Sequence, residues 1–259
     1  MVRGRFAPSP TGRMHLGNVY AALMSYRSAR EQGGEWILRI EDIDPQRSKP
    51  EWRQWIEDDL DWLGLQWDAE YIQSERFDRY ELALDRLREQ GLVYPFAKTR
   101  RERLQKELTA CGAPQANDDL LLRSEAILPC PLTGKGAGGK GLAIRIGDED
   151  IILRRSDGAW AYQLAVVVDD AEMGITEVVR GCDLEPSVKY HHYLQDCLGY
   201  PHPEYKHLPL LCNEAGQRLS KRDKSLDMSV LRQQYDRASL LSMLDTLSPK
   251  GERESMIRL

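Results

Sequence analysis

Near the N-terminus, an apolar strand, a proline-rich turn and a helix follow one another, which limits the chain to folds where strands and helices alternate. Pro8 and Pro10 keep the turn extended, while Gly12 and Gly17 let the backbone approach a ligand closely. Apolar residues then recur at helical spacing: Leu16, Val19, Tyr20 and Leu23. The N-terminal amides of such a helix suit a phosphate. The segment predicts a nucleotide-binding corner or, more simply, a proline-rich loop before an ordinary helix.

The same alternation continues along the next hundred residues. A buried strand is expected over residues 36–40, then a helix that Ser48 and Pro50 open and Gly64 closes, and a further helix that begins after Ser74 and ends at Gly91. Acidic residues follow the strand directly, with Glu41 first among them. In open parallel sheets, ligands bind at the carboxyl ends of the strands, so Glu41 is a candidate for holding a substrate amine. The alternative is a polar turn before Pro45.

The composition changes after Tyr94, where a basic insertion is expected over residues 95–156. Residues 96–145 contain nine lysines and arginines against five acids, a local charge of +4 in a chain of net charge -5. A locally basic segment of an acidic protein can contact nucleic-acid phosphates, although a solvated charged face is the more common reason for such a run.

The α/β pattern resumes after an Asp157-Gly158 turn. The continuous apolar run over residues 164–168 fits either a central strand or a buried helical turn, and periodicity does not separate the two. Tyr162 precedes this run and Arg180 ends the next expected strand, so both are expected near the same crevice. The remaining residues, 229–259, are expected to form a short helical segment.

Two short motifs together resemble the paired signatures of class I aminoacyl-tRNA synthetases of the glutamyl group. The first is Arg5-Phe-Ala-Pro-Ser-Pro-Thr11 followed by His15-Leu-Gly-Asn18, and the second is Arg218-Leu-Ser-Lys-Arg222. Their order and wide separation make the pair more specific than either motif alone. Asn18 stands where the first signature usually ends in His, and Arg218 replaces the leading Lys of the second. Neither change removes a hydrogen-bond donor.

The resemblance implies a Rossmann-like parallel sheet with an inserted α+β subdomain. It divides the chain into a first catalytic half (residues 1–94), the insertion (95–156), a second catalytic half with the second signature (157–228) and a C-terminal helical segment (229–259). A full anticodon-binding domain is not expected, because too few residues follow the second signature to form one.

A pocket for glutamate needs cations for its carboxylates, an anion for its ammonium group and a further donor. The resemblance assigns this set to six positions: Arg5, Ala7, Ser9, Glu41, Tyr162 and Arg180. Surface salt bridges are the alternative for the two arginines. The resemblance also implies that His15, Gly17, Asn18 and Lys221 bind ATP, and that His15, Asn18 and Lys221 act in catalysis.

The implied reaction is ATP-dependent activation of L-glutamate, with Mg²⁺ entering on the nucleotide. The segment Ala161-Tyr-Gln-Leu-Ala-Val-Val-Val-Asp-Asp170 and the short C-terminal segment most resemble truncated members of the group, which transfer glutamate to the queuosine base in the anticodon loop of tRNA(Asp). Three alternatives stay open: acylation of a tRNA 3′ end, nucleotidyl transfer to another small acid, and an inactive paralogue that binds tRNA or nucleotide.

Zinc is expected to be absent. In relatives that hold zinc in the insertion, a Cys-x-Cys pair follows the tyrosine, whereas this chain reads Tyr94-Pro-Phe-Ala-Lys98, and an isolated Cys111 or Cys130 does not complete a tetrahedral site. The sequence shows neither a secretory signal nor a membrane-spanning apolar run. A cytoplasmic monomer without membrane contact is therefore expected.

Overall fold

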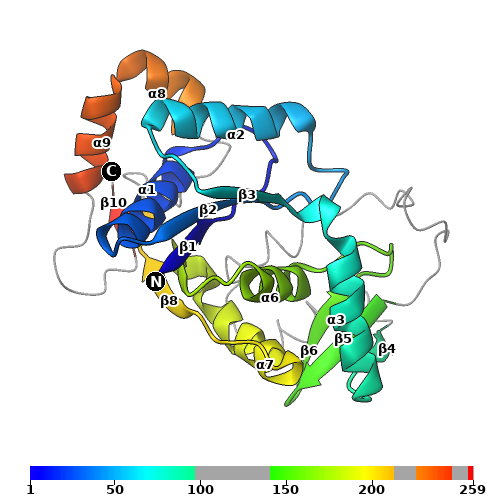
Figure 1. The fold of residues 1–259 in the computed structure, drawn as a ribbon. Helices are drawn as coiled ribbons and strands as arrows, with labels where there is room; N and C mark the ends of the chain where they lie inside the picture. The colour runs from blue at the N-terminus through cyan, green and yellow to red at the C-terminus, as the bar shows by residue number, and fades with distance from the viewer. Residues whose placement is uncertain (97–140, 213–225, 247–255, 259) are drawn as a thin grey trace. The chain divides into compact units, whose positions relative to one another are not determined.

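The computed structural model describes residues 1–96, 141–212, 226–246 and 256–258. The chain divides into two compact units (Figure 1). The first comprises Met1–Arg76, Asp170–Glu185 and His202–Leu259, and the second comprises Phe77–Asp169 and Pro186–Pro201. The domain boundaries expected at residues 94, 156 and 228 stay predictions.

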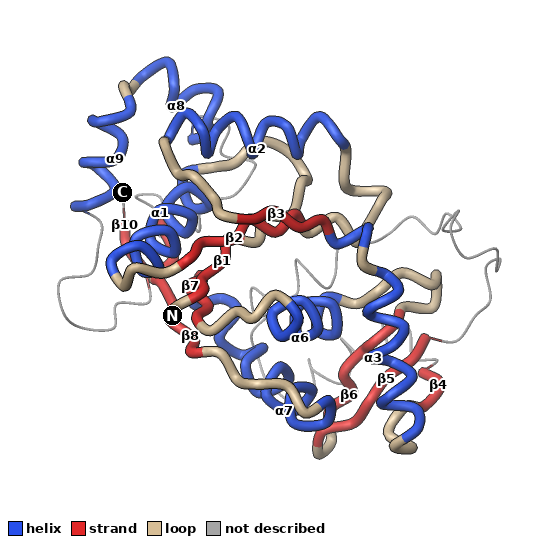
Figure 2. The backbone as a smooth tube through the Cα atoms, viewed as in Figure 1, coloured by secondary structure: helices blue, strands red, loops and turns tan. Residues whose placement is uncertain are grey.

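A parallel sheet forms the centre of the first unit (Figure 2), and its described strands have the order β3-β2-β1-β7-β8. These strands are β1 (Arg3–Phe6), β2 (Glu35–Ile40), β3 (Ala69–Ile72), β7 (Glu177–Gly181) and β8 (Glu204–Leu208). The chain starts at β1, builds outward to β2 and β3, and then returns to the other side of β1. The order therefore reverses between β1 and β7, which is the switch point where open parallel sheets bind ligands.

Apolar residues cover both faces of this sheet. On one face, Phe6, Trp36 and Leu38 pack against helical residues such as Leu23 and Leu60. The helices of that face are α1 (Leu16–Glu31), α2 (Pro50–Leu63), α8 (Met228–Gln234) and α9 (Arg237–Thr246). A smaller cluster of Ile37, Met173, Ile175 and Val178 covers the other face. A short parallel pair, β9 (Leu210–Cys212) and β10 (Met256–Arg258), completes the described part of this unit. The predicted α/β class with a parallel sheet is confirmed.

The second unit contains an antiparallel sheet of β4 (Tyr94–Phe96), β5 (Gly141–Ile146) and β6 (Glu149–Arg154). Its helices are α3 (Phe77–Glu89), α6 (Tyr162–Glu172) and α7 (Val188–Leu198). The apolar run over residues 164–168 belongs to α6, so the helical alternative is the correct one. All five of its residues are at most 1% exposed, and a helix buried on every side shows no helical period in its sequence.

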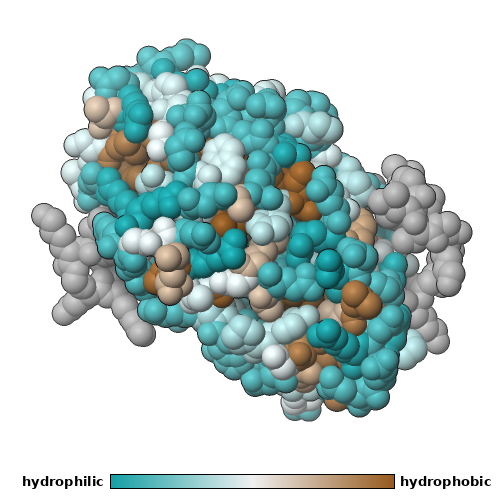
Figure 3. Space-filling model, viewed as in Figure 1, coloured by the Kyte–Doolittle hydropathy of each residue, from teal (hydrophilic) through white to brown (hydrophobic). Residues whose placement is uncertain are grey.

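Helix α6 crosses the division between the units, because its residues up to Asp169 belong to the second unit and those from Asp170 onward belong to the first. Two 3₁₀ turns, Gln73–Glu75 and Cys182–Ser187, precede α3 and α7. None of the helices that the structure describes is long and apolar enough to cross a membrane. The described surface seen in Figure 3 is mostly hydrophilic, with small scattered apolar patches.

Candidate functional site

The first signature forms the turn between β1 and α1, and its polar residues cap the helix. His15 is the N-cap: its Nδ1 accepts a hydrogen bond from the Gly17 amide at 3.1 Å. Asn18 completes a capping box, because its Oδ1 accepts from the His15 amide at 3.2 Å. Gly12 has a φ of 138°, which favours glycine at the bend of the turn. His15 and Asn18 are thus held at the helix end where an anion would bind.

The cap also fixes the proton of the His15 ring. Because Nδ1 accepts a hydrogen bond, the neutral imidazole carries its proton on Nε2, which is then a donor. Gly17 permits this arrangement: a Cβ added at Gly17 would lie 3.0 Å from Cε1 and 3.1 Å from Nδ1 of His15. The sequence singled out Gly17 for contact with a ligand, and the structure shows that its lack of a side chain also accommodates the His15 ring.

Charged side chains lie on the sheet face opposite α1, toward the carboxyl ends of the central strands. Arg39 follows Ile37 at an interval of two residues, and Arg180 follows Val178 in the same way. Since strand residues alternate between faces, both arginines lie on the face that Ile37 and Val178 cover. Arg5, which pairs in register with Ile37 and hydrogen bonds to Asp170, lies on this face too.

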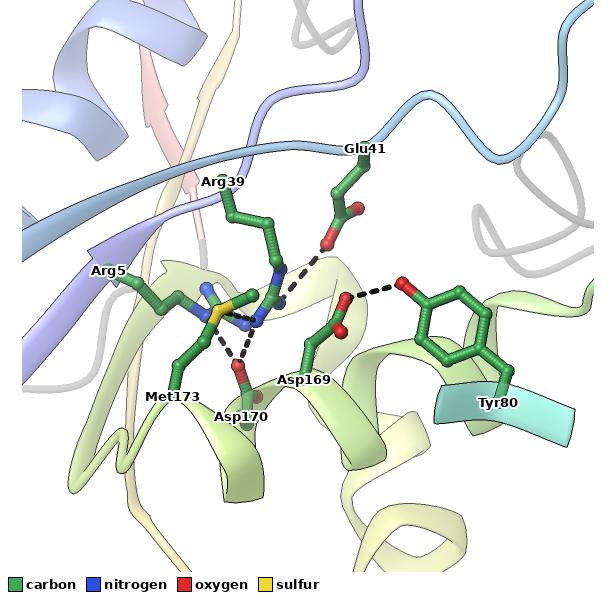
Figure 4. Close-up of polar contacts among 7 residues, drawn as sticks. All are labelled: Arg5, Arg39, Glu41, Tyr80, Asp169, Asp170 and Met173. Carbon is green, nitrogen blue, oxygen red and sulfur yellow. Dashed lines mark hydrogen bonds and ion pairs between the residues drawn. The ribbon is translucent and has the colours of Figure 1, made fainter. Parts of the chain in front are cut away.

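Asp170 joins two of these arginines at the end of α6 (Figure 4). Its Oδ1 accepts from Arg39 Nη1 at 2.6 Å and from Arg5 Nε at 3.3 Å. Arg39 extends the cluster, because its Nη2 lies 3.2 Å from Glu41 Oε1. We name Arg5, Arg39, Glu41 and Asp170 the sheet-face cluster. It connects the acid predicted to hold an ammonium group with an arginine predicted to hold a carboxylate.

The two carboxylates of the sheet-face cluster differ in pKa. Burial alone would raise the pKa of Asp170, but Arg39 and Arg5 outweigh it and lower that pKa to about 2. Burial raises the pKa of Glu41, and the charges of Arg39 and Arg5 only partly oppose it. Asp170 is therefore a permanent anion at neutral pH, whereas Glu41 is a desolvated acid that a further cation would stabilise.

Arg180 lies one strand away, on β7. Gly4 pairs with Glu177 in parallel, and three residues further along each chain segment this register brings Arg180 level with Ala7, the residue directly after β1. Its Nη2 donates to the Leu184 carbonyl at 3.0 Å, and its guanidinium lies over the Tyr205 ring, 4.9 Å from the centroid. With an exposed fraction of 4%, Arg180 is a buried residue.

Ala7 and Ser9 continue from β1 into the turn. The Glu41 amide donates to the Pro8 carbonyl at 3.0 Å, so the parallel pairing of β1 with β2 extends one step past the strands. Ala7 and Ser9 are half-buried, whereas the preceding Arg5 is buried. The predicted glutamate positions of the first unit therefore lie on adjacent chain segments at the carboxyl edge of the sheet.

Tyr162 and Lys221 are the remaining predicted site residues. Tyr162 begins α6 in the second unit, where its ring lies 5.9 Å from the ring of the fully buried His191. Lys221 and its signature lie outside the described residues. The described chain resumes at Leu226, and there Asp227 pairs with His15 in an antiparallel bridge. The residue six positions after Lys221 thus contacts the first signature.

The sequence reasoning did not assign Arg39 or Asp170 a role. A signal for Arg39 was present, since it is the charged residue within the apolar strand Trp36-Ile-Leu-Arg-Ile40. No comparable signal identified its partner, because 131 positions separate Arg39 from Asp170. Among the described residues, no group of three or more His, Cys, Asp or Glu is placed to hold a metal ion. The absence of zinc stays a prediction, since Cys111 and Cys130 lie outside those residues.

Comparisons with known proteins agree with this geometry. Residues 1–121 and 142–258 match the family described as tRNA synthetases class I (E and Q), catalytic domain. A Glutamyl-Q tRNA(Asp) synthetase from Nitratidesulfovibrio vulgaris is 40% identical, with 90% of this chain and 81% of that protein covered. The protein of the same name from Neisseria gonorrhoeae is 42% identical, covering 85% of this chain and 80% of its own length.

Solved structures give the same result. A glutamate tRNA ligase from Elizabethkingia meningosepticum, solved in complex with its amino acid, superposes with a TM-score of 0.74 at 29% identity. The match covers 94% of this chain and 60% of that ligase, so the chain spans about three fifths of this longer protein. The paired signatures, the parallel sheet and these matches show that the chain belongs to the class I tRNA synthetases of the E and Q group and contains their catalytic domain.

Proposed function

We propose that the protein activates L-glutamate with ATP and transfers the glutamyl group to the queuosine base of tRNA(Asp). The observation that carries the first step is the placement of Arg5, Glu41 and Arg180 on one face of the sheet, at its switch point. The names of the similar proteins from N. vulgaris and N. gonorrhoeae support the acceptor.

Charge complementarity supports glutamate as the substrate. Arg5, Arg39 and Arg180 contribute three positive charges, and Asp170 and ionised Glu41 contribute two negative ones. The net charge of +1 on these side chains matches the net charge of -1 on free glutamate. The ammonium group would pair with Glu41, and its charge would oppose the burial that raises the Glu41 pKa. Arg5 and Arg180 would bind the carboxylates, with Ala7 leaving room and Ser9 and Tyr162 contributing further contacts.

Activation needs stabilisation of phosphate charge and no protein nucleophile. A carboxylate oxygen of glutamate attacks the α-phosphorus of ATP, and pyrophosphate leaves with the electron pair of the broken P–O bond. Negative charge grows on the phosphate oxygens in this step. We assign its stabilisation to Nε2–H of His15, the amides at the N-terminus of α1 near Gly17, and the side chains of Asn18 and Lys221. Magnesium would enter bound to ATP and neutralise the phosphates.

The second step transfers the glutamyl group from the adenylate to the modified base. A hydroxyl of the queuosine cyclopentene diol attacks the glutamyl carbonyl carbon, AMP leaves, and the hydroxyl proton passes to solvent. The basic segment over residues 96–145 is the candidate for holding the anticodon loop, since its charge suits nucleic-acid phosphates. This segment lies mostly outside the described residues, so its contribution is proposed from sequence.

Two measurements test the proposal, one for each step of the reaction. Glutamate-dependent exchange of labelled pyrophosphate into ATP, without exchange for aspartate or glutamine, would support activation. Labelled glutamate should then attach to tRNA(Asp) that contains queuosine but not to a transcript of the same tRNA with guanine at that position. Equal charging of the two tRNAs would show acylation of the 3′ end instead, and failure of the exchange reaction would refute the activity.

A further inference from the structure

A second buried carboxylate lies on the opposite side of the sheet from the sheet-face cluster. Asp59 is on α2, and its exposed fraction is 0%. Its Oδ1 accepts from Arg13 Nη2 at 2.7 Å and from Arg232 Nη1 at 3.1 Å. We name these residues the Asp59 cluster. Its members come from three separate segments of the first unit.

The two arginines belong to the parts of the chain that adjoin the two signatures. Arg13 lies in the turn of the first signature, directly after Gly12, and Arg232 lies on α8, the helix that follows the second signature. The backbone already joins these parts, because the Met228 amide donates to the Met14 carbonyl at 2.9 Å. Asp59 adds a side-chain connection between the same two segments.

The surroundings of Asp59 hold both guanidinium groups in place. The Arg13 guanidinium lies over the Trp55 ring at 5.7 Å, and that of Arg232 lies over the Trp62 ring at 5.3 Å, with both rings on α2. Each arginine is thus fixed by a charged contact and an aromatic one. Figures 1 and 2 show α8 beside α2, as the shared apolar core requires.

Stability alone is a weak reason for this arrangement. A buried ion pair gains little over apolar side chains of similar size, and Asp59 is surrounded along α2 by the buried apolar residues Ile56, Leu60 and Leu63. What the carboxylate provides that a leucine would not is a fixed direction for both arginines. The arrangement therefore sets the position of the turn before α1 relative to α8.

We propose that Asp59 is a positioning residue for ATP: through Arg13 and Arg232 it holds the phosphate-facing turn against α8. The inference rests on the proposed function in one respect, the binding of ATP at the N-terminus of α1. It predicts a selective effect, because Asp59 lies on the face of the sheet away from Arg5, Glu41 and Arg180. Loss of Asp59 should weaken ATP binding and leave the glutamate requirement unchanged.

The test compares Asp59→Asn and Arg232→Gln with a matched control, Glu57→Gln. Glu57 lies on the same helix and pairs with Arg53 at 2.6 Å, away from both signatures. In pyrophosphate exchange, each test variant should raise the KM for ATP about tenfold, the change that about 1.4 kcal/mol produces, with the KM for glutamate unchanged. The control should change neither KM. Equilibrium binding of ATP to the folded protein should show the same loss.

Coupling between the residues sharpens the test. If Asp59 acts through Arg232, the double variant should bind ATP no more weakly than Asp59→Asn alone. An unchanged ATP affinity in folded Arg232→Gln would overturn the inference, as would an equal loss in Glu57→Gln. The Arg232 side chain is 32% exposed, so Arg232→Gln should fold. Its ATP affinity therefore tests the inference even if Asp59→Asn does not fold. A wild-type protein that binds ATP without glutamate-dependent exchange would refute the proposed activity, and the binding comparison would still decide this inference.

Discussion

Asp170 and Asp59 are both buried between two arginines, yet their pKa values shift in opposite directions. Burial would raise both values; the arginines lower that of Asp170 to about 2, whereas the pKa of Asp59 stays raised despite Arg13 and Arg232. The exposure of the arginines explains the difference. The side chains of Arg39 and Arg5 are 0% and 5% exposed, and those of Arg13 and Arg232 are 24% and 32% exposed.

The comparison teaches that the same three charges act differently when water reaches the cations. Solvent screens an exposed guanidinium, so its field at a buried carboxylate is weaker than that of a buried one. The sheet-face cluster is therefore a strongly coupled set of charges in which the loss of one member leaves its partners buried with fewer opposite charges around them. In the Asp59 cluster, water already reaches part of each arginine, so the cluster fixes their geometry at a smaller energetic cost.

The largest expected difference between the two clusters is the loss of unfolding free energy when each carboxylate is removed. Asp170→Ala removes the anion that two buried arginines share, which should cost about 3–5 kcal/mol of unfolding free energy and abolish pyrophosphate exchange. Asp59→Ala should cost less, about 1–3 kcal/mol, because Arg13 and Arg232 regain contact with water. Urea unfolding of the two variants measures both values. Equal losses, or a larger loss for Asp59→Ala, would show that exposure of the arginines is not the cause.

The next effect separates the two substrates that we propose for these regions, glutamate and ATP. Arg5→Ala and Arg180→Ala each remove a charge-assisted contact, worth about 1.5–3 kcal/mol, and should raise the KM for glutamate roughly ten- to hundredfold. The KM for ATP should stay constant, which is the reverse of the pattern expected for Arg232→Gln. Arg53→Ala, which removes an arginine of α2 that is 38% exposed, is the control. Unchanged glutamate dependence in both site variants would refute the pocket.

Acid unfolding should distinguish the two carboxylates by sign. The folded-state pKa of Asp170 is lowered from 3.8 to about 2, so its contribution is fully present above pH 3.8 and is lost as the pH falls toward 2. As the pH falls through that range, the unfolding free energy of Asp170→Asn should therefore decrease by roughly 2 kcal/mol less than that of the wild type. The raised pKa of Asp59 acts oppositely, since the folded state takes up the proton first.

Asp59→Asn should accordingly make the acid-induced loss of stability steeper than in the wild type above pH 3.8, where the folded state binds the Asp59 proton before the unfolded state does. Urea unfolding at several pH values from neutral down to about 2 gives the slope for each variant, with the Asp59 effect expected above pH 3.8 and the Asp170 effect below it. If both asparagine variants change the dependence of unfolding free energy on pH in the same direction, the opposite pKa shifts of Asp59 and Asp170 are refuted.

Much of the fold followed from local sequence, and much of the site from resemblance. Alternating strand and helix patterns place Arg5, Glu41 and Arg180 at strand ends, because each lies at the end of a recognisable apolar run. The helix over residues 162–172 was ambiguous because complete burial removes periodicity. Arg39–Asp170 and Arg13–Asp59 were not predictable, since charged pairs 131 and 46 positions apart depend on tertiary packing that leaves no local pattern.

The smallest expected effect concerns salt. At about 1 M ionic strength the Debye length falls to roughly 3 Å, so charges that water reaches are largely screened while buried pairs are not. A double-mutant cycle between Asp59 and Arg232 should therefore lose a few tenths to about 1 kcal/mol of coupling between low and high salt. The cycle between Asp170 and Arg39 should stay constant, because Arg39 is fully buried. Equal salt sensitivity of the two cycles would mean that water reaches both clusters alike, and the opposite pKa shifts would then need another cause.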